Sequence, residues 1–441
     1  MPHPLTAEMQ DAARRKDRDA LSAGLERLRG QPDLDSFDLL VTAIEVKEAG
    51  FREVAQALFN LLLERDWGYA AGHYELAVLL RYWGRHLEAV HHAKFAVQFA
   101  PGEARYRNLY ALVLNAVGAH PEAQAVLDEG LPASGGEPED AAVVRAFGDY
   151  VRDTPRGRAQ LLVQQVRDEF YWMSTEQVAA EINKAMDERR GFSLIRMGDG
   201  EGAFTKVDAA DEARYAPLYD WMRRDWHRAL FGASFDARRT GYAAVVDTLL
   251  DVSLEQDIVG VPYASWVDHE YEIASLRGIP CVLNVHRAYL AAARRGQRRP
   301  LVCDQRIHIE LHNQGFVEPI LRRAGSVGVI SCHSQLPDRM KAAFGLHEVE
   351  LFKIPGEKYT ENLRSADQMS GEHFPHVYWD IVRRLSVPHN GRVFMIAAGT
   401  LAKFYADTIK RHGGIALDLG SLVDGWLNIS SRPGYGAELA L

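Results

Sequence analysis

The segment GFSLIRMGDGEGAF (residues 191–204) holds the residues whose types and spacing best suit chemistry. Asp199 and Glu201 lie two positions apart with a glycine between them, so in an extended segment both carboxylates can bend towards one point. Carboxylate oxygens with few other donors suit Mg²⁺ or Mn²⁺, which bridge protein carboxylates to a substrate diphosphate. The motif predicts that Asp199 and Glu201 bind a metal ion, which would stabilise a diphosphate leaving group.

A second segment, RVFMIAAGTLAK (392–403), runs from an apolar strand through Ala-Gly-Thr into a helix. Backbone N–H groups and the Thr400 hydroxyl at a helix N-terminus favour anions, and Lys403 follows one turn later. The spacing is not that of a P-loop. The alternative is an ordinary strand-to-helix turn with a surface lysine.

Both segments follow runs with the character of buried strands, which alternate with helical segments from residue 191 onwards. The runs are FSLIRM (192–197), DIVGVP (257–262), CVLNV (281–285), SVGVIS (326–331), VELFKI (349–354), RVFMIAA (392–398) and GIALDLG (414–420). This alternation predicts a Rossmann-like α/β domain with a mainly parallel sheet covered on both faces. Ligands of such sheets lie beyond the carboxyl ends of the strands, where His333 and Asp418 are also expected.

The N-terminal part carries a repeat of different character. Gly50, Gly84 and Gly118 are spaced 34 residues apart. An alanine precedes each glycine by seven residues, and another follows it by five. These residues are Ala43, Ala77, Ala111, Ala55, Ala89 and Ala123, and the middle unit adds Ala96 and Pro101. Residues 36–132 therefore resemble three tetratricopeptide (TPR) repeats, which stack helix-turn-helix units.

The domain organisation follows from these patterns. We expect a helical cap, a degenerate repeat, at 1–35, TPR-like repeats at 36–132, a linker with bridging helices at 133–173, and the α/β domain at 174–441. Within these limits, PASGGEPED (132–140) marks the end of the array, and Ser174 with Gln177 fits a helix capping box. The array is either a scaffold or a groove that docks a protein. His73, Tyr74, Arg81, Tyr82 and Trp83 are candidates to line that groove.

Composition and charge argue against several classes of function and site. The formal net charge is -9, and Lys and Arg do not cluster as nucleic-acid binding usually requires. Cys281, Cys303 and Cys332 lack metal-type spacing and are expected to be small core residues. The start of the chain lacks the apolar region of a signal peptide, and no apolar run reaches membrane-spanning length. We therefore expect a cytoplasmic protein without a membrane span.

On IRMGDGE (195–201) and AAGTLAKFYADTIKRHGGIALDLGSLVDGW (397–426), residues 175–430 resemble the bacterial GT-D-type glycosyltransferases. The resemblance implies a Rossmann-like fold and transfer of a sugar, typically a hexose, from a nucleotide-sugar donor. It also implies that the acid-x-acid pair serves Mn²⁺ or Mg²⁺ and the donor diphosphate, and that Arg196 lies near the donor. From their places in the glycine-rich turn, at a helix N-terminus and at a strand end, Gly198, Gly200, Thr400, Lys403 and Asp418 are expected around the donor as well. Leu419 and SLVDGW (421–426) depart from the family's ending, where an isoleucine and a histidine are expected.

The catalytic base stays open at this point. Asp424 and Asp418 end a strand region and could activate an acceptor hydroxyl, while Asp304 and His308 are rivals. His333 is expected to be structural or a donor contact. The acceptor would be a surface or flagellar protein docked by the array, or a surface polysaccharide. The two alternatives are an S-adenosylmethionine-dependent methyltransferase and a non-catalytic TPR adaptor with an inactive α/β domain.

Overall fold

The computed structural model describes residues 3–31, 34–130, 139–358, 369, 371–429 and 439–441. The chain divides into two compact units, one of Met1–Arg156 with Asp268–Leu276 and one of Gly157–Val267 with Arg277–Leu441. Each unit is described by itself. No helix of the described ranges has both the length and the apolar character that crossing a lipid bilayer requires.

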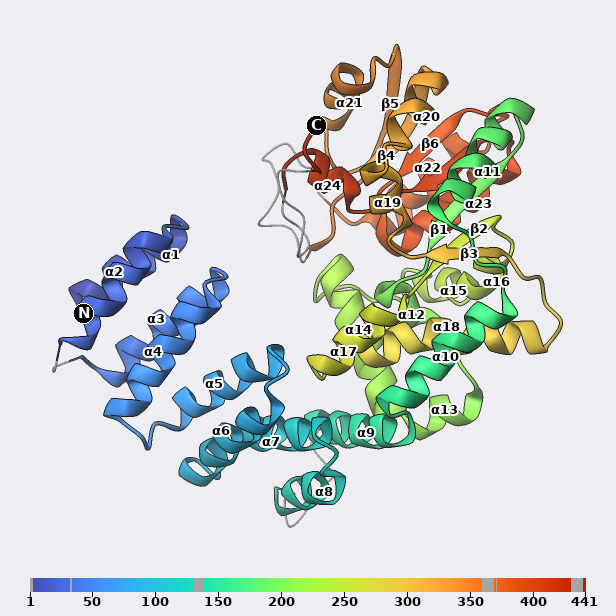
Figure 1. The fold of residues 1–441 in the computed structure, drawn as a ribbon. Helices are drawn as coiled ribbons and strands as arrows, with labels where there is room; N and C mark the ends of the chain where they lie inside the picture. Colours follow the sequence, from blue (N-terminus) through green and yellow to red (C-terminus); the bar gives the residue numbers. More distant parts are fainter. Residues whose placement is uncertain (1–2, 32–33, 131–138, 359–368, 370, 430–438) are drawn as a thin grey trace. The chain divides into compact units, whose positions relative to one another are not determined.

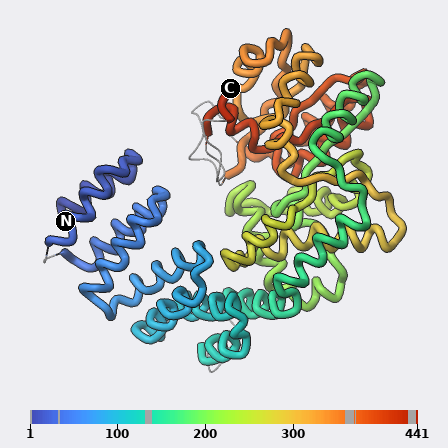
Figure 2. The backbone as a smooth tube through the Cα atoms, in the orientation of Figure 1, coloured from blue at the N-terminus to red at the C-terminus, as the bar shows by residue number. Residues whose placement is uncertain are grey.

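The first unit is an array of paired helices (Figures 1 and 2). They are α1 (Pro4–Arg14), α2 (Arg18–Arg29), α3 (Ser36–Glu48), α4 (Arg52–Arg65), α5 (Ala70–Tyr82), α6 (His86–Phe99), α7 (Ala104–Ala116), α8 (His120–Glu129) and α9 (Glu139–Asp153). The pairs α3–α4, α5–α6 and α7–α8 coincide with the three predicted repeats, and α1–α2 form a helix pair within the segment predicted as a cap. Most of the predicted linker falls at 131–138, outside the described residues.

The glycines of the 34-residue period end the first helix of each pair. Gly50, Gly84 and Gly118 have φ angles of +94°, +70° and +82°. This left-handed region strains any residue with a Cβ atom, which explains the glycine at each turn. The alanines seven residues before and five residues after each glycine are all fully buried. Small side chains at these positions let the two helices of each pair approach closely.

The residues predicted to line a groove have different surroundings in the structure. His73 is fully buried, and its ring contacts Trp67, His92 and Phe95. Its prediction as a groove residue was therefore wrong, because it packs between the helices of one repeat. Tyr82 is exposed, whereas Tyr74, Arg81 and Trp83 are half-buried.

Asp268–Leu276, a distant segment, belongs to this unit. The Arg81 guanidinium donates to the carbonyl oxygens of Ile273 at 3.0 Å and Ala274 at 2.9 Å. Arg156 forms ion pairs with Asp268 at 2.5 Å and Glu272 at 3.2 Å. The array therefore includes a strip of chain separated from it by more than a hundred residues.

The second unit contains a seven-stranded parallel sheet in the order β3-β2-β1-β7-β6-β4-β5. The strands are β1 (Phe192–Arg196), β2 (Ile258–Val261), β3 (Leu301–Asp304), β4 (Ser326–Ser331), β5 (Glu348–Lys353), β6 (Val393–Ile396) and β7 (Ile415–Asp418). The predicted α/β class with a parallel sheet is confirmed. The continuous burial of β1, β2, β6 and β7 explains their mainly apolar sequences, in which the polar residues are Ser193, Arg196 and Asp418.

The rest of this unit is helical (Figure 1). Before β3 lie α10 (Arg156–Glu169), α11 (Thr175–Glu188), α12 (Asp199–Phe204), α13 (Ala209–Arg214), α14 (Ala216–Phe231), α15 (Tyr242–Val246), α16 (Leu249–Leu254), α17 (Ala264–Glu272) and α18 (Gly278–Arg294). Of α17, the residues from Asp268 onwards belong to the first unit. After β3 lie α19 (Ile307–Asn313), α20 (Val317–Ala324), α21 (Leu336–Phe344), the π-helix His373–Val377, α22 (Tyr378–Leu385), the 3₁₀ turn Gly399–Leu401, α23 (Ala402–Arg411) and α24 (Leu422–Trp426). The predicted capping box of Ser174 and Gln177 is present at the start of α11.

Two predictions about strands were wrong. CVLNV (281–285) is not a strand but the first half of α18, because the apolar pattern continues through Ala292 and buries most of that helix. LVCD (301–304) forms β3, a four-residue edge strand that sequence reasoning missed.

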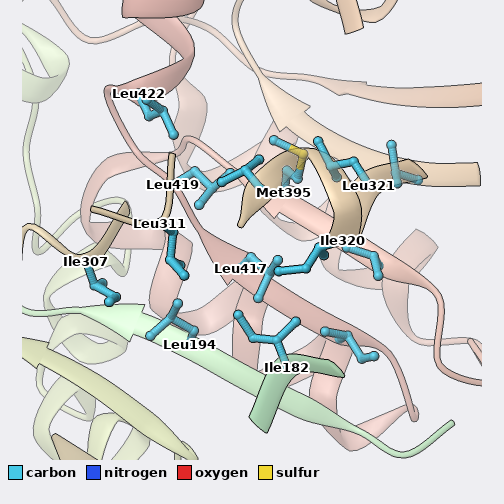
Figure 3. Packing of buried hydrophobic residues seen from close by; sticks show 14 of the residues in the cluster. Ile182, Leu194, Ile307, Leu311, Ile320, Leu321, Met395, Leu417, Leu419 and Leu422 are labelled. Carbon is cyan, nitrogen blue, oxygen red and sulfur yellow. The ribbon is translucent and has the colours of Figure 1, made fainter. Parts of the chain in front are cut away.

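A large apolar core packs the sheet against its helices. Figure 3 shows Ile182 of α11, Ile307 and Leu311 of α19, and Ile320 and Leu321 of α20 beside the strand residues Leu194, Met395 and Leu417. Cys281 and Cys303 are buried, as expected for small core residues, whereas Cys332 is half-buried. This core fixes the strand ends that carry the polar side chains considered next.

Candidate active site

The polar side chains singled out in the sequence gather at the carboxyl edge of the sheet. Because β1, β7, β6 and β4 are neighbours and parallel, the segments that follow them emerge at the same edge. These segments carry Asp199 and Glu201 after β1, Thr400 and Lys403 after β6, and His333 after β4, while Asp418 is the last residue of β7. The rule that ligands lie beyond carboxyl strand ends makes this edge the candidate site.

Arg196, the last residue of β1, is only 9% exposed and is held by β7. Its Nε donates to the carbonyl oxygen of Asp418 at 3.0 Å, and its Nη2 lies 3.3 Å from Asp418 Oδ1. Its Nη1 lies 3.2 Å from the ring nitrogens of His308. The guanidinium therefore bridges β7 and α19 beneath the turn.

Lys403 joins the same cluster from the first turn of α23. Its ammonium lies 2.6 Å from Glu201 Oε1, 3.1 Å from Asp418 Oδ2 and 3.3 Å from the carbonyl oxygen of Gly399. An ammonium group has three N–H donors, and here three acceptors surround it. Lys403 is 3% exposed, so in this arrangement it has neither an N–H group nor a surface to offer a ligand.

Contacts within the cluster change the pKa values of Asp418 and Lys403. Burial opposes ionisation of Asp418, but Lys403 and Arg196 outweigh it and hold the pKa of that carboxyl below its ordinary value. Burial likewise disfavours the charged lysine, yet Asp418 and Glu201 raise the pKa of Lys403 above its ordinary value. Both groups are therefore ionised at neutral pH.

The GDGEG turn begins a short helix, α12, immediately after β1. Glu201 is buried, and its Oε2 accepts the Gly198 N–H at 2.8 Å, while half-buried Asp199 accepts the Gly200 N–H at 3.0 Å through Oδ1. At Gly202 a Cβ atom would meet the carbonyl oxygen of Cys281 at 1.9 Å. The glycine at 202 thus lets α12 lie directly against α18, whereas the acids on either side of Gly200 have separate partners.

The two carboxylates do not fit the predicted metal site. Both oxygens of Glu201 are engaged, and the Lys403 ammonium lies where a cation would approach Oε1. Within the described residues, no group of three or more His, Cys, Asp or Glu side chains is placed to hold a metal ion. Asp199 is half-buried, whereas Glu201 is buried. The predicted metal clamp of Asp199 and Glu201 is therefore absent from this arrangement.

His333 and Asp424 form a second polar pair at this edge. His333 Nε2 lies 2.7 Å from Asp424 Oδ1 in α24, and His333 is buried whereas Asp424 is half-buried. Burial opposes the charged imidazole, but the hydrogen bonds with Asp424 and Cys332 prevail and raise the pKa of His333 to about 9. His333 is therefore protonated at neutral pH, and its pairing with Asp424 is an arrangement that sequence reasoning missed.

The remaining candidates occupy separate places. Asp304 ends β3 and accepts the Arg306 N–H at 2.7 Å, and burial raises its pKa. His308 is buried against Arg196. Thr400 is buried, and its Oγ1 lies 3.7 Å from the Cβ position of Gly200, so it adjoins the GDGEG turn.

A pocket lies on the other side of Thr400. Its lining residues are Leu230, Phe231, Tyr242, Pro355, Gly356, Glu357, Lys358, Gly371, Glu372, His373, Ala398, Thr400 and Leu401. One part of this wall is aromatic and aliphatic, and another carries carboxylates and a hydroxyl. Sequence reasoning missed Glu357, although its place just after β5 satisfies the strand-end rule that identified the others.

Comparisons with known proteins give little guidance. No family model matches the chain. No curated protein matches it either. Among solved structures, a mutant O-GlcNAc transferase from Thermobaculum terrenum has 13% sequence identity and a TM-score of 0.23, over 96% of this chain and 75% of that one. A similarity this low carries no argument about this chain, so its function must be inferred from the geometry.

Proposed function

We propose that the α/β unit is a glycosyltransferase that moves a sugar, a hexose in the first instance, from a nucleotide-sugar donor to an acceptor. One observation carries this proposal: the segments after β1, β4, β6 and β7 bring polar groups to one sheet edge, and one of these groups, Thr400, also lines a pocket. Ligand pockets usually combine an apolar wall with a few convergent polar groups. A sugar ring presents the matching mixture of C–H faces and hydroxyl groups.

In this proposal the donor sugar lies in the pocket. Phe231 offers aromatic surface to its C–H face, while Glu357 and Thr400 accept or donate hydrogen bonds to its hydroxyls. The diphosphate lies towards the GDGEG turn, where Thr400 adjoins Gly200. Arg196 and Asp418 act beneath the turn and fix its position.

His333 serves the departing diphosphate. Transfer breaks the bond between the sugar and the diphosphate, so negative charge develops on the leaving oxygen. An imidazolium donates a charge-assisted hydrogen bond to such an oxygen, and Asp424 keeps His333 in that protonated form. Asp424, one of the candidate bases, therefore acts through His333 in this proposal.

The metal requirement and the acceptor are separate parts of the proposal. In this proposal the Mn²⁺ or Mg²⁺ ion binds at Asp199, because the charge of Glu201 is already balanced by Lys403.

The acceptor is a protein or a glycan, and the helical array recruits a protein acceptor or partner through exposed side chains such as Tyr82.

The test is nucleotide release from a panel of nucleotide-sugars, measured with Mn²⁺, with Mg²⁺ and with chelator. We expect one donor to be hydrolysed slowly in the absence of acceptor, and Asp199→Asn and His333→Gln to lower that rate at least about tenfold. Asp338→Asn, on exposed helix α21, is the matched control and should leave the rate unchanged. The proposal fails if the folded chain neither binds nor hydrolyses any donor, or if both site variants keep full activity.

A further inference from the structure

Four charged side chains are buried together where β1, β7 and α23 meet. Arg196, Lys403, Glu201 and Asp418 are between 1% and 9% exposed. Two are cationic and two are anionic, so the cluster is neutral when all four are ionised. Burying unpaired charges is costly, and such a cluster is tolerated only when its charges balance and its hydrogen bonds are made.

Glu201 has two partners that link separate parts of the chain. One carboxylate oxygen accepts the Gly198 N–H and so closes the first turn of α12. The other oxygen accepts from Lys403, which is 202 positions further along the chain. The turn that carries Asp199 is therefore tied to α23 through a single side chain.

Lys403 supplies the positive charge that a metal ion would otherwise bring to Glu201. A divalent cation at Oε1 would have to displace the ammonium, and the displaced ammonium would lie in an enclosed region beside Arg196. The cluster would then carry a net positive charge in a poorly hydrated place, which is unfavourable.

We propose that the acid-x-acid motif is not a two-carboxylate metal clamp: Glu201 and Lys403 are positioning residues that hold the GDGEG turn, and any ligand contact of the motif falls to half-buried Asp199. This inference rests on the proposed function for the identity of the ligand. In this inference the positive charge beside Glu201 comes from the Lys403 ammonium and not from a metal ion.

A double-mutant cycle tests the pair by thermal unfolding. Glu201→Gln leaves the cluster with one excess positive charge, and Lys403→Met leaves one excess negative charge. The double variant is neutral again and keeps the ion pair of Arg196 with Asp418. We expect both single variants to unfold at lower temperature than the parent chain, and the double variant to unfold above both of them.

A pair from the helical array provides the matched control. Lys47 and Glu75 lie 2.5 Å apart, but their side chains are 21% and 17% exposed, so water can solvate either charge alone. Lys47→Met, Glu75→Gln and their combination should therefore show little coupling. If the effects of Glu201→Gln and Lys403→Met on the unfolding temperature are additive, as they should be in the control pair, the two residues are not coupled and the inference is overturned.

A local measurement separates positioning from general stability. Hydrogen exchange of residues 197–205 should accelerate in Glu201→Gln, because one amide oxygen must serve both Lys403 and the Gly198 N–H. The protection should return in the double variant, where Lys403 no longer competes. Equal acceleration throughout the α/β unit would instead indicate a purely structural role and would contradict the proposal.

Mn²⁺ binding, measured by calorimetry without donor, tests the division between the two acids. Glu201→Gln should leave any Mn²⁺ affinity within about threefold of the parent chain, whereas Asp199→Asn should lower it by about tenfold or more. A tenfold loss of affinity in folded Glu201→Gln would overturn the inference. None of these readouts requires sugar transfer, so their failure is distinguishable from failure of the proposed function.

Discussion

His333 of the segment after β4 lies 2.7 Å from Asp424 of α24, and this contact crosses the end of β6, which lies between β4 and β7 in the sheet. The folded pKa of His333, about 9, is above its ordinary value of 6.5. Folding therefore favours the protonated form. The resulting stability is fully present below pH 6.5 and is lost as the pH rises towards 9, by at most about 3 kcal/mol.

Urea unfolding of the α/β unit, measured across this pH window, checks that expectation. Asp424→Asn should lower stability near neutral pH and flatten the loss between pH 6.5 and 9, because the imidazole no longer gains its carboxylate partner. Asp338→Asn should keep the slope of the parent chain. An unchanged slope in Asp424→Asn would show that the pair does not control the pKa of His333.

Arg196→Lys should destabilise the α/β unit by roughly 2–4 kcal/mol, although the charge is retained. The guanidinium reaches the carbonyl and carboxylate oxygens of Asp418 and the ring of His308 at the same time, and an ammonium cannot span these groups. Arg322→Lys is the control, since Arg322 is exposed and paired with Glu318 on one helix face. Its expected effect on the unfolding free energy is below about 0.5 kcal/mol. Equal stabilities of the two variants would refute the bridging role.

Gly202→Ala should prevent the close contact of α12 with α18. The added Cβ would lie 1.9 Å from the carbonyl oxygen of Cys281 and 2.6 Å from its carbonyl carbon, and both obstacles are backbone atoms. We expect a loss of about 2 kcal/mol or more in unfolding free energy, with a fall in donor hydrolysis because the turn shifts. Gly157→Ala, in the first turn of α10 with no atom within 4 Å of the added Cβ, should instead be neutral or stabilise by up to about 1 kcal/mol.

The repeat glycines allow an internal comparison. Gly50→Ala meets no atom within 4 Å, so its cost is the left-handed backbone alone, about 1–2 kcal/mol. Gly84→Ala adds a contact of 3.1 Å with the carbonyl oxygen of Glu272 and should cost more. Hydrogen exchange of the array helices measures both variants. A smaller loss of protection for Gly84→Ala than for Gly50→Ala would contradict this ranking.

The fold was largely predictable because its main signals are local. The repeat glycines indicate left-handed turns, and the buried strands β2 and β6 are apolar throughout. The two strand errors have a physical origin. CVLNV is apolar in either a strand or a buried helix, and only its continuation to Arg294 distinguishes them, whereas LVCD has four residues and ends in an acid.

The site was predictable in location but not in its contacts. The strand-end rule brings Arg196, Thr400, Asp418 and His333 to one edge, as the structure shows. Sequence spacing cannot show that Lys403 turns inward to Glu201, because that contact joins segments 202 positions apart and depends on how α23 packs. The motif therefore suggested a metal where the structure has a lysine.

The strip Asp268–Leu276 changes how this protein can be dissected. The chain passes between the two compact units three times, at 156/157, 267/268 and 276/277. A fragment that ends at Arg156 would therefore lack the carbonyl oxygens of Ile273 and Ala274, which accept hydrogen bonds from Arg81. The complementary fragment would contain Asp268–Leu276 without the array residues that this strip contacts. Transfer of the array to another protein must therefore include Asp268–Leu276 as a second, short segment taken from within the α/β sequence.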